Sequence, residues 1–156
     1  ELHVLAQLLA QRPRLVIALE MLPRRVQPVL DRWVAGALSE EAFLRESNWR
    51  EVWGADPALY LPIFHFARMH RVPLVAANVG RALTRAVSEQ GFEAVPESQR
   101  EGLTPPAAAA PGYVDLIWQT AAEHMPDGKR PAQGRQDPSF QRLVEAQLAW
   151  DRAMAQ

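Results

Sequence analysis

The sequence predicts an α/β fold with a parallel-sheet core and flanking helices. Two short apolar segments, residues 14–20 and 73–78, have the aliphatic composition of buried strands, and each ends in a polar side chain. Between and around them, apolar residues recur every three or four positions, as they do along one face of an amphipathic helix. Strands that alternate with helices in this way pair in parallel.

The first apolar segment is expected to be a strand buried on both faces, because residues 15–19 are all apolar. This strand is expected to stop at Glu20. A helix that ends at residue 11 precedes it, and a helix that begins at Pro23 and is stopped by Gly36 follows it.

Two capped helices are expected next. Ser39 has the position of an N-cap, and the two glutamates after it favour the first turn of a short helix. Asp56 and Pro57 begin a second helix that runs to about His70, and Pro62 is expected to bend or restart it.

The second strand, residues 73–78, leads into a helix over residues 81–90 that Gly91 ends. Residues 92–111 show no regular period and are expected to form a mobile loop. The remaining segments are expected to be a helix over residues 112–124 closed by Met125-Pro126, a poorly ordered polar loop over 127–136, and a helix from Asp137 to the end.

The length of 156 residues is typical of a single domain with a substantial core. The chain begins without a methionine inside one helical pattern and stops inside another. We therefore expect residues 1–156 to be one α/β domain, taken from a longer protein and lacking flanking strands at both ends.

Composition narrows the function classes. Seventeen basic residues against 18 acidic ones give a net charge of −1, which does not favour nucleic acid or an anionic membrane as a partner. No cysteine is present, so any metal or haem must be held by oxygen or nitrogen ligands. No apolar run reaches the roughly 18 residues of a membrane-spanning helix.

Two polar residues end the predicted strands, and both are candidate ligand-binding residues. The carboxyl ends of parallel strands meet at one rim of the sheet, so Glu20 and Asn78 are expected close together there. Ligands of α/β proteins bind at this rim. For Glu20, the alternative is that its charge simply favours the start of the following helix.

The chain has two tyrosines, Tyr60 and Tyr113. Tyr60, which lies between the two tryptophans and Pro62, is expected to pack its ring and keep its hydroxyl group at the edge. Tyr113 begins a helix that His124 ends, and the two lie about 16 Å apart on nearly the same face. They cannot bind one metal ion from one helix, but they could line one apolar surface or reach the same ligand from two subunits. The alternative is a half-buried tyrosine and a histidine at a helix end.

No short motif assigns a reaction to this chain. The other histidines, His3, His65 and His70, form no metal-binding pattern, and the last two are expected to be surface residues; His3 is the more interesting of the three as a site candidate. There is no nucleophile elbow and no glycine-rich phosphate loop.

The order of several short segments resembles the ChaN family of haem-binding uptake lipoproteins. The segments that carry the resemblance are Ala18-Leu19-Glu20-Met21, residues 27–33 with Gly36, the pair Trp49 and Trp53, Tyr60-Leu61-Pro62, residues 75–78 before Arg81, and Glu145-Ala146-Gln147 with Trp150-Asp151, Met154 and Ala155. The family's Gly-Glu-x-His and Gly-x-x-His segments are absent from this sequence.

This resemblance implies an α/β protein, related more distantly to TraB/Tiki peptidases and erythromycin esterases, that holds two stacked haems between two subunits. A tyrosine would bind the iron with a histidine nearby. Carried over to this sequence, Tyr113 is the expected ligand, His124 its neighbour and Tyr60 the alternative ligand. A phenolate favours ferric haem and leaves the sixth position weakly held, which suits a carrier.

The resemblance therefore predicts a protein of haem and iron uptake that is not an enzyme, forms a homodimer with haem, and is membrane-anchored or periplasmic, with membrane uptake components as possible partners. The competing hypothesis is a metal-dependent hydrolase of the Tiki or esterase kind, in which Glu20 would activate a metal-bound water.

Overall fold

The computed structural model describes residues 2–124 and 133–156, apart from the side chains of residues 122 and 124. The chain forms two compact units, Glu1–Val79 and Gly80–Gln156. The prediction of one domain over residues 1–156 stays a prediction.

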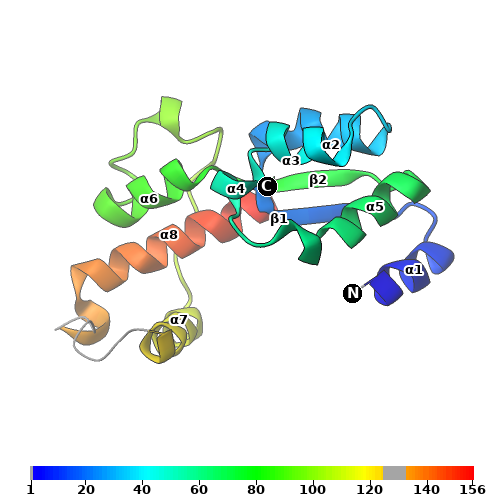
Figure 1. Ribbon diagram of the computed structural model, residues 1–156. Helices are drawn as coiled ribbons and strands as arrows, with labels where there is room; N and C mark the ends of the chain where they lie inside the picture. Colours follow the sequence, from blue (N-terminus) through cyan, green and yellow to red (C-terminus); the bar gives the residue numbers. More distant parts are fainter. Residues whose placement is uncertain (1, 125–132) are drawn as a thin grey trace. The chain divides into compact units, whose positions relative to one another are not determined.

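The first unit is built on two parallel strands, β1 (Ile17–Pro23) and β2 (Leu74–Asn78), which lie side by side in Figure 1. Ile17 is in register with Leu74 and Leu19 with Ala76, and after an irregularity Pro23 pairs with Asn78. Helices join the two strands. The predicted α/β fold with a parallel sheet is therefore confirmed.

The end of the first strand differs from the prediction. β1 passes through Glu20 and continues to Pro23, whose extended backbone (φ −74°, ψ 151°) suits a strand end. Leu22 is fully buried, so its packing in the core extends the strand beyond the polar residue. A 3₁₀ turn, Arg24–Val26, follows, and α2 (Gln27–Val34) begins with a proline in its own first turn.

The expectation that the first strand is buried on both faces is wrong. Along β1, Leu19 is buried while Ala18 and Glu20 are exposed, and along β2 the buried Leu74 and Ala76 flank an exposed Val75. Side chains alternate between the faces of a sheet, and the core of this unit lies on one face only. An apolar run thus does not show by itself that both faces are covered.

The other helices of the first unit include one that the sequence does not predict, at Trp49–Val52, and a 3₁₀ turn at Pro57 where a continuous helix is expected to begin. They are α1 (Leu2–Gln11), α3 (Glu40–Glu46), α4 (Trp49–Val52), a 3₁₀ turn at Pro57–Leu59 and α5 (Leu61–His70). The Ser39 side chain accepts a hydrogen bond from the amide of Ala42 at 3.2 Å, and Asp56 accepts one from Ala58 at 3.0 Å. Pro62 lies in the first turn of α5, so the helix restarts there.

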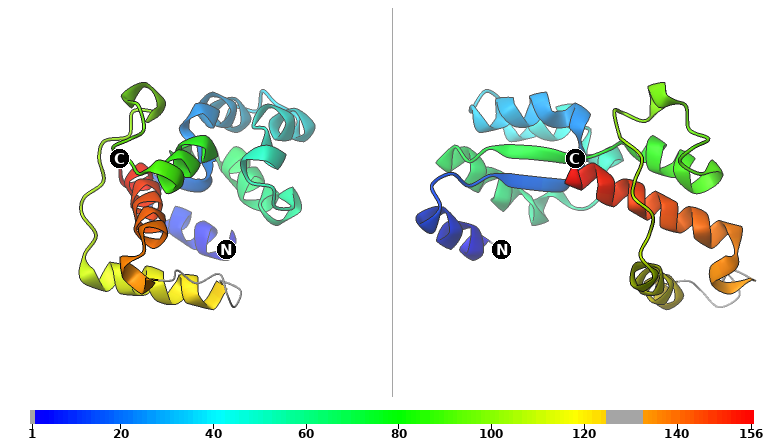
Figure 2. Two further views of the ribbon diagram at one scale, coloured as in Figure 1. Left: turned by 90° about the vertical axis from the view of Figure 1, so that its left-hand side faces the viewer. Right: turned by 180° about the vertical axis from the view of Figure 1, so that it is seen from behind.

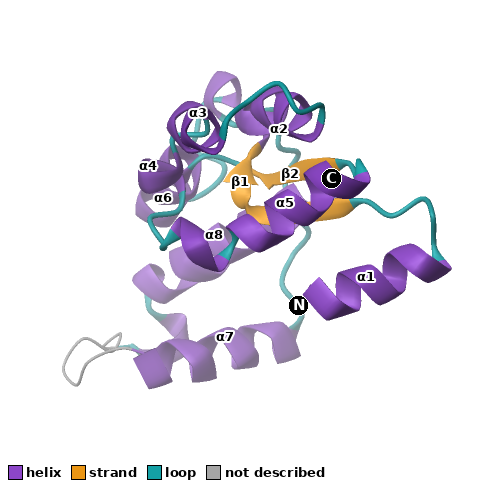
Figure 3. Ribbon diagram, turned by 45° about the vertical axis from the view of Figure 1, so that its right-hand side comes forward, coloured by secondary structure: helices purple, strands orange, loops and turns teal. Residues whose placement is uncertain are grey.

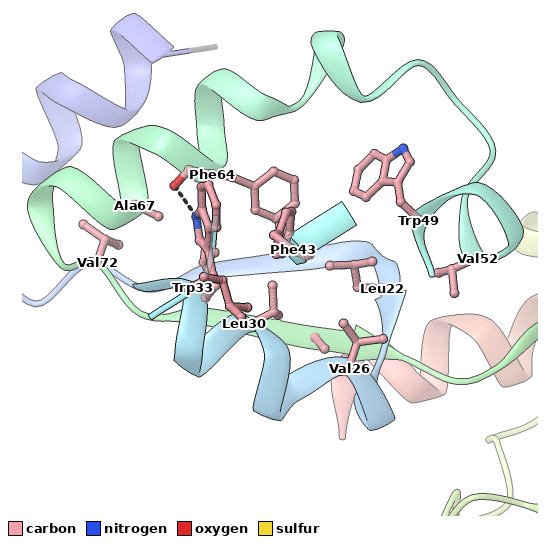
Figure 4. Packing of buried hydrophobic residues seen from close by; sticks show 14 of the residues in the cluster. Leu22, Val26, Leu30, Trp33, Phe43, Trp49, Val52, Phe64, Ala67 and Val72 are labelled. Atoms are coloured by element: carbon pink, nitrogen blue, oxygen red, sulfur yellow. Dashed lines mark hydrogen bonds between the residues drawn. The ribbon is translucent and has the colours of Figure 1, made fainter. Parts of the chain in front are cut away.

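An aromatic cluster forms the centre of this core, as Figure 4 shows. The Trp33 ring lies 4.7 Å from Phe43, and Phe43 lies 4.9 Å from Phe64, between ring centroids. The indole nitrogen of Trp33 donates to the carbonyl oxygen of Phe64 at 2.8 Å. The guanidinium of Arg68 covers the Trp33 ring at 4.7 Å and donates to the carbonyl of Leu38. Together these contacts join α2, α3 and α5.

In its described part, the second unit is helical (Figure 3). It contains α6 (Arg81–Gln90), 3₁₀ turns at Glu97–Gln99 and Gly134–Gln136, α7 (Pro111–His124) and α8 (Pro138–Ala155). Figure 2 shows α6 beside α8, and α7 running across α8. Two predicted helix ends are confirmed: Gly91 ends α6 with φ +85°, and Asp137 caps α8 through the amide of Ser139 at 2.9 Å.

The segment predicted as a loop over residues 92–111 contains more structure than expected. Phe92, Val95 and Leu103 are buried, and Arg100 covers the Phe92 ring at 4.6 Å while donating to the carbonyl of Val95 at 2.8 Å. These buried residues are irregularly spaced, so no period reveals them. Of the polar loop predicted over residues 127–136, residues 127–132 lie outside the described part of the chain.

Candidate functional site

Tyr113 stands in the first turn of α7, and a carboxylate from α8 holds its hydroxyl group. The phenol donates a short hydrogen bond to Oδ2 of Asp151. The other oxygen of Asp151 accepts a hydrogen bond from Nε2 of Gln147 at 3.2 Å. All three side chains are half-buried. Within the second unit they form a chain from phenol to carboxylate to amide.

This environment favours the protonated phenol. Burial, the hydrogen bond to Asp151 and the negative charge of that carboxylate together raise the pKa of Tyr113 far above its ordinary range. The side chain is therefore neutral at physiological pH. At physiological pH, a phenolate at this position would therefore need a cation that binds the oxygen and offsets its charge.

The surroundings of Tyr113 combine an oxygen atom with an exposed apolar side chain. Leu116, three residues further along α7, is 56% exposed, so one face of the helix presents an oxygen donor next to an apolar side chain. A phenolate oxygen is a hard donor of the kind that suits ferric iron. The helix itself is held firmly, because the Trp118 ring packs edge-on against Phe140 at 5.0 Å.

His124 is the last residue of α7, and its side chain lies outside the described part of the structure. Tyr113 and His124 lie eleven steps apart on one helix, so the predicted separation of about 16 Å applies to their backbones. The two residues therefore cannot reach one iron from the same chain. The role of His124 stays a prediction.

Tyr60, the alternative ligand, lies in the first unit within an aromatic cluster. Its ring centroid is 5.4 Å from that of Trp49 and 6.2 Å from that of Trp53. The side chain is half-buried. This is the packing expected of an aromatic residue at the edge of a core, and its role as a ligand stays a prediction.

The side chain of Asn78 contacts the backbone of Glu20. The Asn78 side chain is 1% exposed; its Nδ2 donates to the carbonyl oxygen of Glu20 at 2.9 Å, and its Oδ1 accepts from the amide of Val79 at 2.8 Å. The side chain of Glu20 lies on the open face of β1. Asn78 thus joins the two strands in the structure, and a direct role of either side chain in ligand binding stays a prediction.

The remaining histidines lie at the surface of the first unit. His65 pairs with Glu40 at 2.9 Å and is half-exposed, and the exposed His70 packs its ring 4.6 Å from Phe66. His3 is exposed on α1. Across residues 2–124 and 133–156, no three histidine, aspartate or glutamate side chains converge on a possible metal position. None of the described helices is both long and apolar enough to cross a bilayer.

A pocket of about 450 Å³ lies in the second unit, away from Tyr113. Its walls come from the end of α6, the loop around Pro105 and Pro106, and the side chains of Glu145 and Leu148 on α8. Neither Tyr113 nor Asp151 lines it. The hydroxyl group of Tyr113 is therefore part of a helix surface rather than of this pocket.

Sequence reasoning did not identify Asp151 and Gln147 as site residues, although both belong to the segments that carry the family resemblance. Their spacing of four places them on one face of α8. That spacing predicts a contact between the two side chains within α8. It does not predict which side chain of another helix they contact.

The fold and the site define an α/β protein whose second unit presents a phenolic hydroxyl group held by a carboxylate. Over residues 1–156 the chain matches the family described as haem-binding uptake, Tiki superfamily, ChaN. The chain belongs to this family, and the resemblance found in the sequence is confirmed. No curated protein and no solved structure matches it.

Proposed function

We propose that this chain binds ferric haem, iron protoporphyrin IX, for haem and iron uptake, and that Tyr113 is the iron ligand. The observation that carries the proposal is the half-buried phenol of Tyr113, held by Asp151 beside the exposed Leu116, in a member of a haem-binding family. Haem would supply a ferric ion and a broad apolar face, which match the oxygen donor and the apolar side chain.

Tyr113 and Asp151 have different roles in the proposed site. Oη of Tyr113 provides the ligand atom, and Oδ2 of Asp151, which already accepts its hydrogen bond, is the nearest atom that could hold the phenolic proton. Tyrosine ligation leaves the sixth position of the iron weakly held. We therefore propose a carrier rather than an enzyme.

The finer proposals concern assembly and location. We propose a homodimer in the haem-bound state, in which His124 of one subunit approaches the ligand of the other. We also propose that the protein works anchored to a membrane or in the periplasm and exchanges haem with membrane uptake components.

Titration with haemin tests the function. The wild type should bind haemin saturably, with the Soret and charge-transfer bands of tyrosinate-ligated ferric haem, and Tyr113→Phe should lose the charge-transfer band. Tyr60→Phe is the matched control, because Tyr60 belongs to the other unit, and it should leave both bands unchanged. Loss of the bands in Tyr60→Phe alone would reassign the ligand, and absence of saturable binding in the wild type would overturn the function.

A further inference from the structure

The carboxylate of Asp151 lies where it can set the direction of the Tyr113 phenol. We propose that Asp151, itself oriented by Gln147, is the positioning residue that aims Oη of Tyr113 for binding to iron. This inference rests on the proposed function, because it assigns a role in the same haem site.

The first argument is that each oxygen of Asp151 has its own partner. Oδ2 accepts from the phenol on α7, and Oδ1 accepts from Gln147 at 3.2 Å. Gln147 and Asp151 are one turn apart on α8, so the orientation of the carboxylate is fixed within its own helix. The direction of the phenol is therefore determined by α8, although Tyr113 belongs to α7.

The second argument is that this hydrogen bond is not needed to hold α7 in place. The Trp118 ring packs against Phe140 of α8, and Asp115 of α7 forms an ion pair with Arg135, just before α8 begins. These contacts attach α7 independently of Asp151. Removal of the Asp151 carboxylate should therefore change the orientation of one phenol rather than release the helix.

The third argument is chemical. The phenol has one proton, on the oxygen that would bind iron. Iron binding would therefore pass that proton to Oδ2 of Asp151, and the carboxyl group would then donate a hydrogen bond back to the phenolate oxygen and keep its direction. Loss of such a partner typically lowers metal affinity by about 10- to 100-fold. We expect an effect of this size on haemin affinity when the Asp151 carboxylate is removed.

The experiment compares Asp151→Asn and Gln147→Leu with Asp115→Asn as the matched control. Asp115 is an aspartate of the same unit whose carboxylate pairs with Arg135 rather than with the phenol. Each full chain is labelled with tyrosine carrying ¹³C at the ring carbon that bears the hydroxyl group. Because the chain has two tyrosines, the spectrum has two resonances, which Tyr60→Phe assigns.

In the haem-free protein, Asp151→Asn should move the Tyr113 resonance and leave that of Tyr60 in place. With haemin, the same variant should shift the charge-transfer band and weaken binding by about 10- to 100-fold. Gln147→Leu should act in the same direction with a smaller effect. Asp115→Asn should change neither the resonance nor the band, because the Trp118–Phe140 contact still holds α7 and the ion pair it removes is half-exposed.

The results separate the two proposals. Suppose that Asp151→Asn binds haemin with wild-type affinity and an unshifted band, and that Tyr113→Phe loses the band. The positioning role of Asp151 would then be wrong, and the proposed haem function would remain. An unchanged band in Tyr113→Phe would overturn Tyr113 as the ligand, and the inference with it. If Asp151→Asn does not fold, Gln147→Leu provides the test. An unchanged Tyr113 resonance and an unchanged haemin affinity in this variant would overturn the inference.

Discussion

The indole nitrogen of Trp33 donates a hydrogen bond of 2.8 Å to the carbonyl oxygen of Phe64, and this bond joins α2 to α5 inside the core of the first unit. Both residues are at most 1% exposed. In the folded protein the Phe64 carbonyl therefore has the indole as its partner in place of solvent water.

The first prediction follows from this bond. Trp33→Phe should lower the free energy of unfolding by about 2–4 kcal/mol, because it leaves the Phe64 carbonyl unsatisfied and opens a void next to Phe43. Urea unfolding monitored by circular dichroism measures the change. Leu59→Ala is the control, because Leu59 is 71% exposed and should change stability by less than about 0.5 kcal/mol. Equal stability of Trp33→Phe and the wild type would contradict the prediction.

The second prediction concerns Asn78, whose side chain joins the ends of the two strands. Asn78→Ala should destabilise the protein by about 2–3 kcal/mol, since the Glu20 carbonyl and the Val79 amide each lose a partner. Asn78→Asp keeps the acceptor for Val79 but places a carboxylate against the Glu20 carbonyl. This variant should therefore regain stability as the pH falls and the carboxyl group becomes a donor. Urea midpoints at pH 7 and pH 4 measure both effects, and an Asn78→Asp variant that is no more stable, relative to the wild type, at pH 4 would refute the explanation.

Local signals in the sequence predicted most of the helix ends. Ser39, Asp56 and Asp137 cap helices, and Gly91 ends one, because each acts on backbone groups within a few residues. Such features depend on neighbouring residues alone, so a single sequence reveals them.

Features that depend on distant residues were harder to predict. The strand continues past Glu20 because Leu22 packs in a core built from later helices, and the segment 92–111 contains buried residues without a period. In the site, Tyr113 was predicted, but its partner Asp151 lies 38 residues away. Which carboxylate meets which phenol is decided by how the helices pack, and a single sequence carries no signal for that.

The third prediction uses two glycines that both have a positive φ. A side chain at Gly102 (φ +73°) should cause strain of about 1 kcal/mol, and one at Gly91 (φ +85°, ψ 157°) at least as much, because that ψ lies outside the left-handed helical region. A Cβ atom at Gly91 would also come within 3.0 Å of the Glu145 carboxylate, which accepts a hydrogen bond from the Phe92 amide, whereas nothing lies within 4 Å at Gly102. Gly91→Ala should thus be more destabilising than Gly102→Ala by about 1 kcal/mol in urea unfolding. Equal losses would show that Glu145 moves aside without loss of stability.

The fourth prediction concerns the pH dependence of stability. Because the pKa of Tyr113 is raised in the folded protein, folding retains a proton that the unfolded chain releases near pH 10. The stabilisation is complete below that pH and is lost progressively as the pH rises above it. The wild type should therefore lose stability more steeply between pH 9 and pH 11 than Tyr113→Phe, which lacks this phenol. If the urea midpoints of the two proteins change by the same amount over this pH range, Asp151 does not hold the phenolic proton.

The last prediction is that haem binding and dimerisation are linked. Tyr113 and His124 lie about 16 Å apart along α7 and cannot meet at one iron within a chain, but a two-fold axis would bring His124 of one subunit toward the ligand of the other. Two haems stacked between subunits would also remove apolar surface from water that each monomer would otherwise expose. By mass action, haemin must then raise the dimer fraction, and dilution must weaken the apparent haemin affinity.

Sedimentation velocity across a concentration series, with and without haemin, measures this linkage. His124→Ala should weaken haemin binding and the haemin-dependent dimer together without abolishing the charge-transfer band, whereas Tyr113→Phe should lose the band itself. His65→Ala is the control, because His65 is half-exposed in the other unit and pairs with Glu40, and it should leave both the affinity and the dimer unchanged. A protein that binds haemin and sediments as a monomer at every concentration would show that the site is complete within one chain.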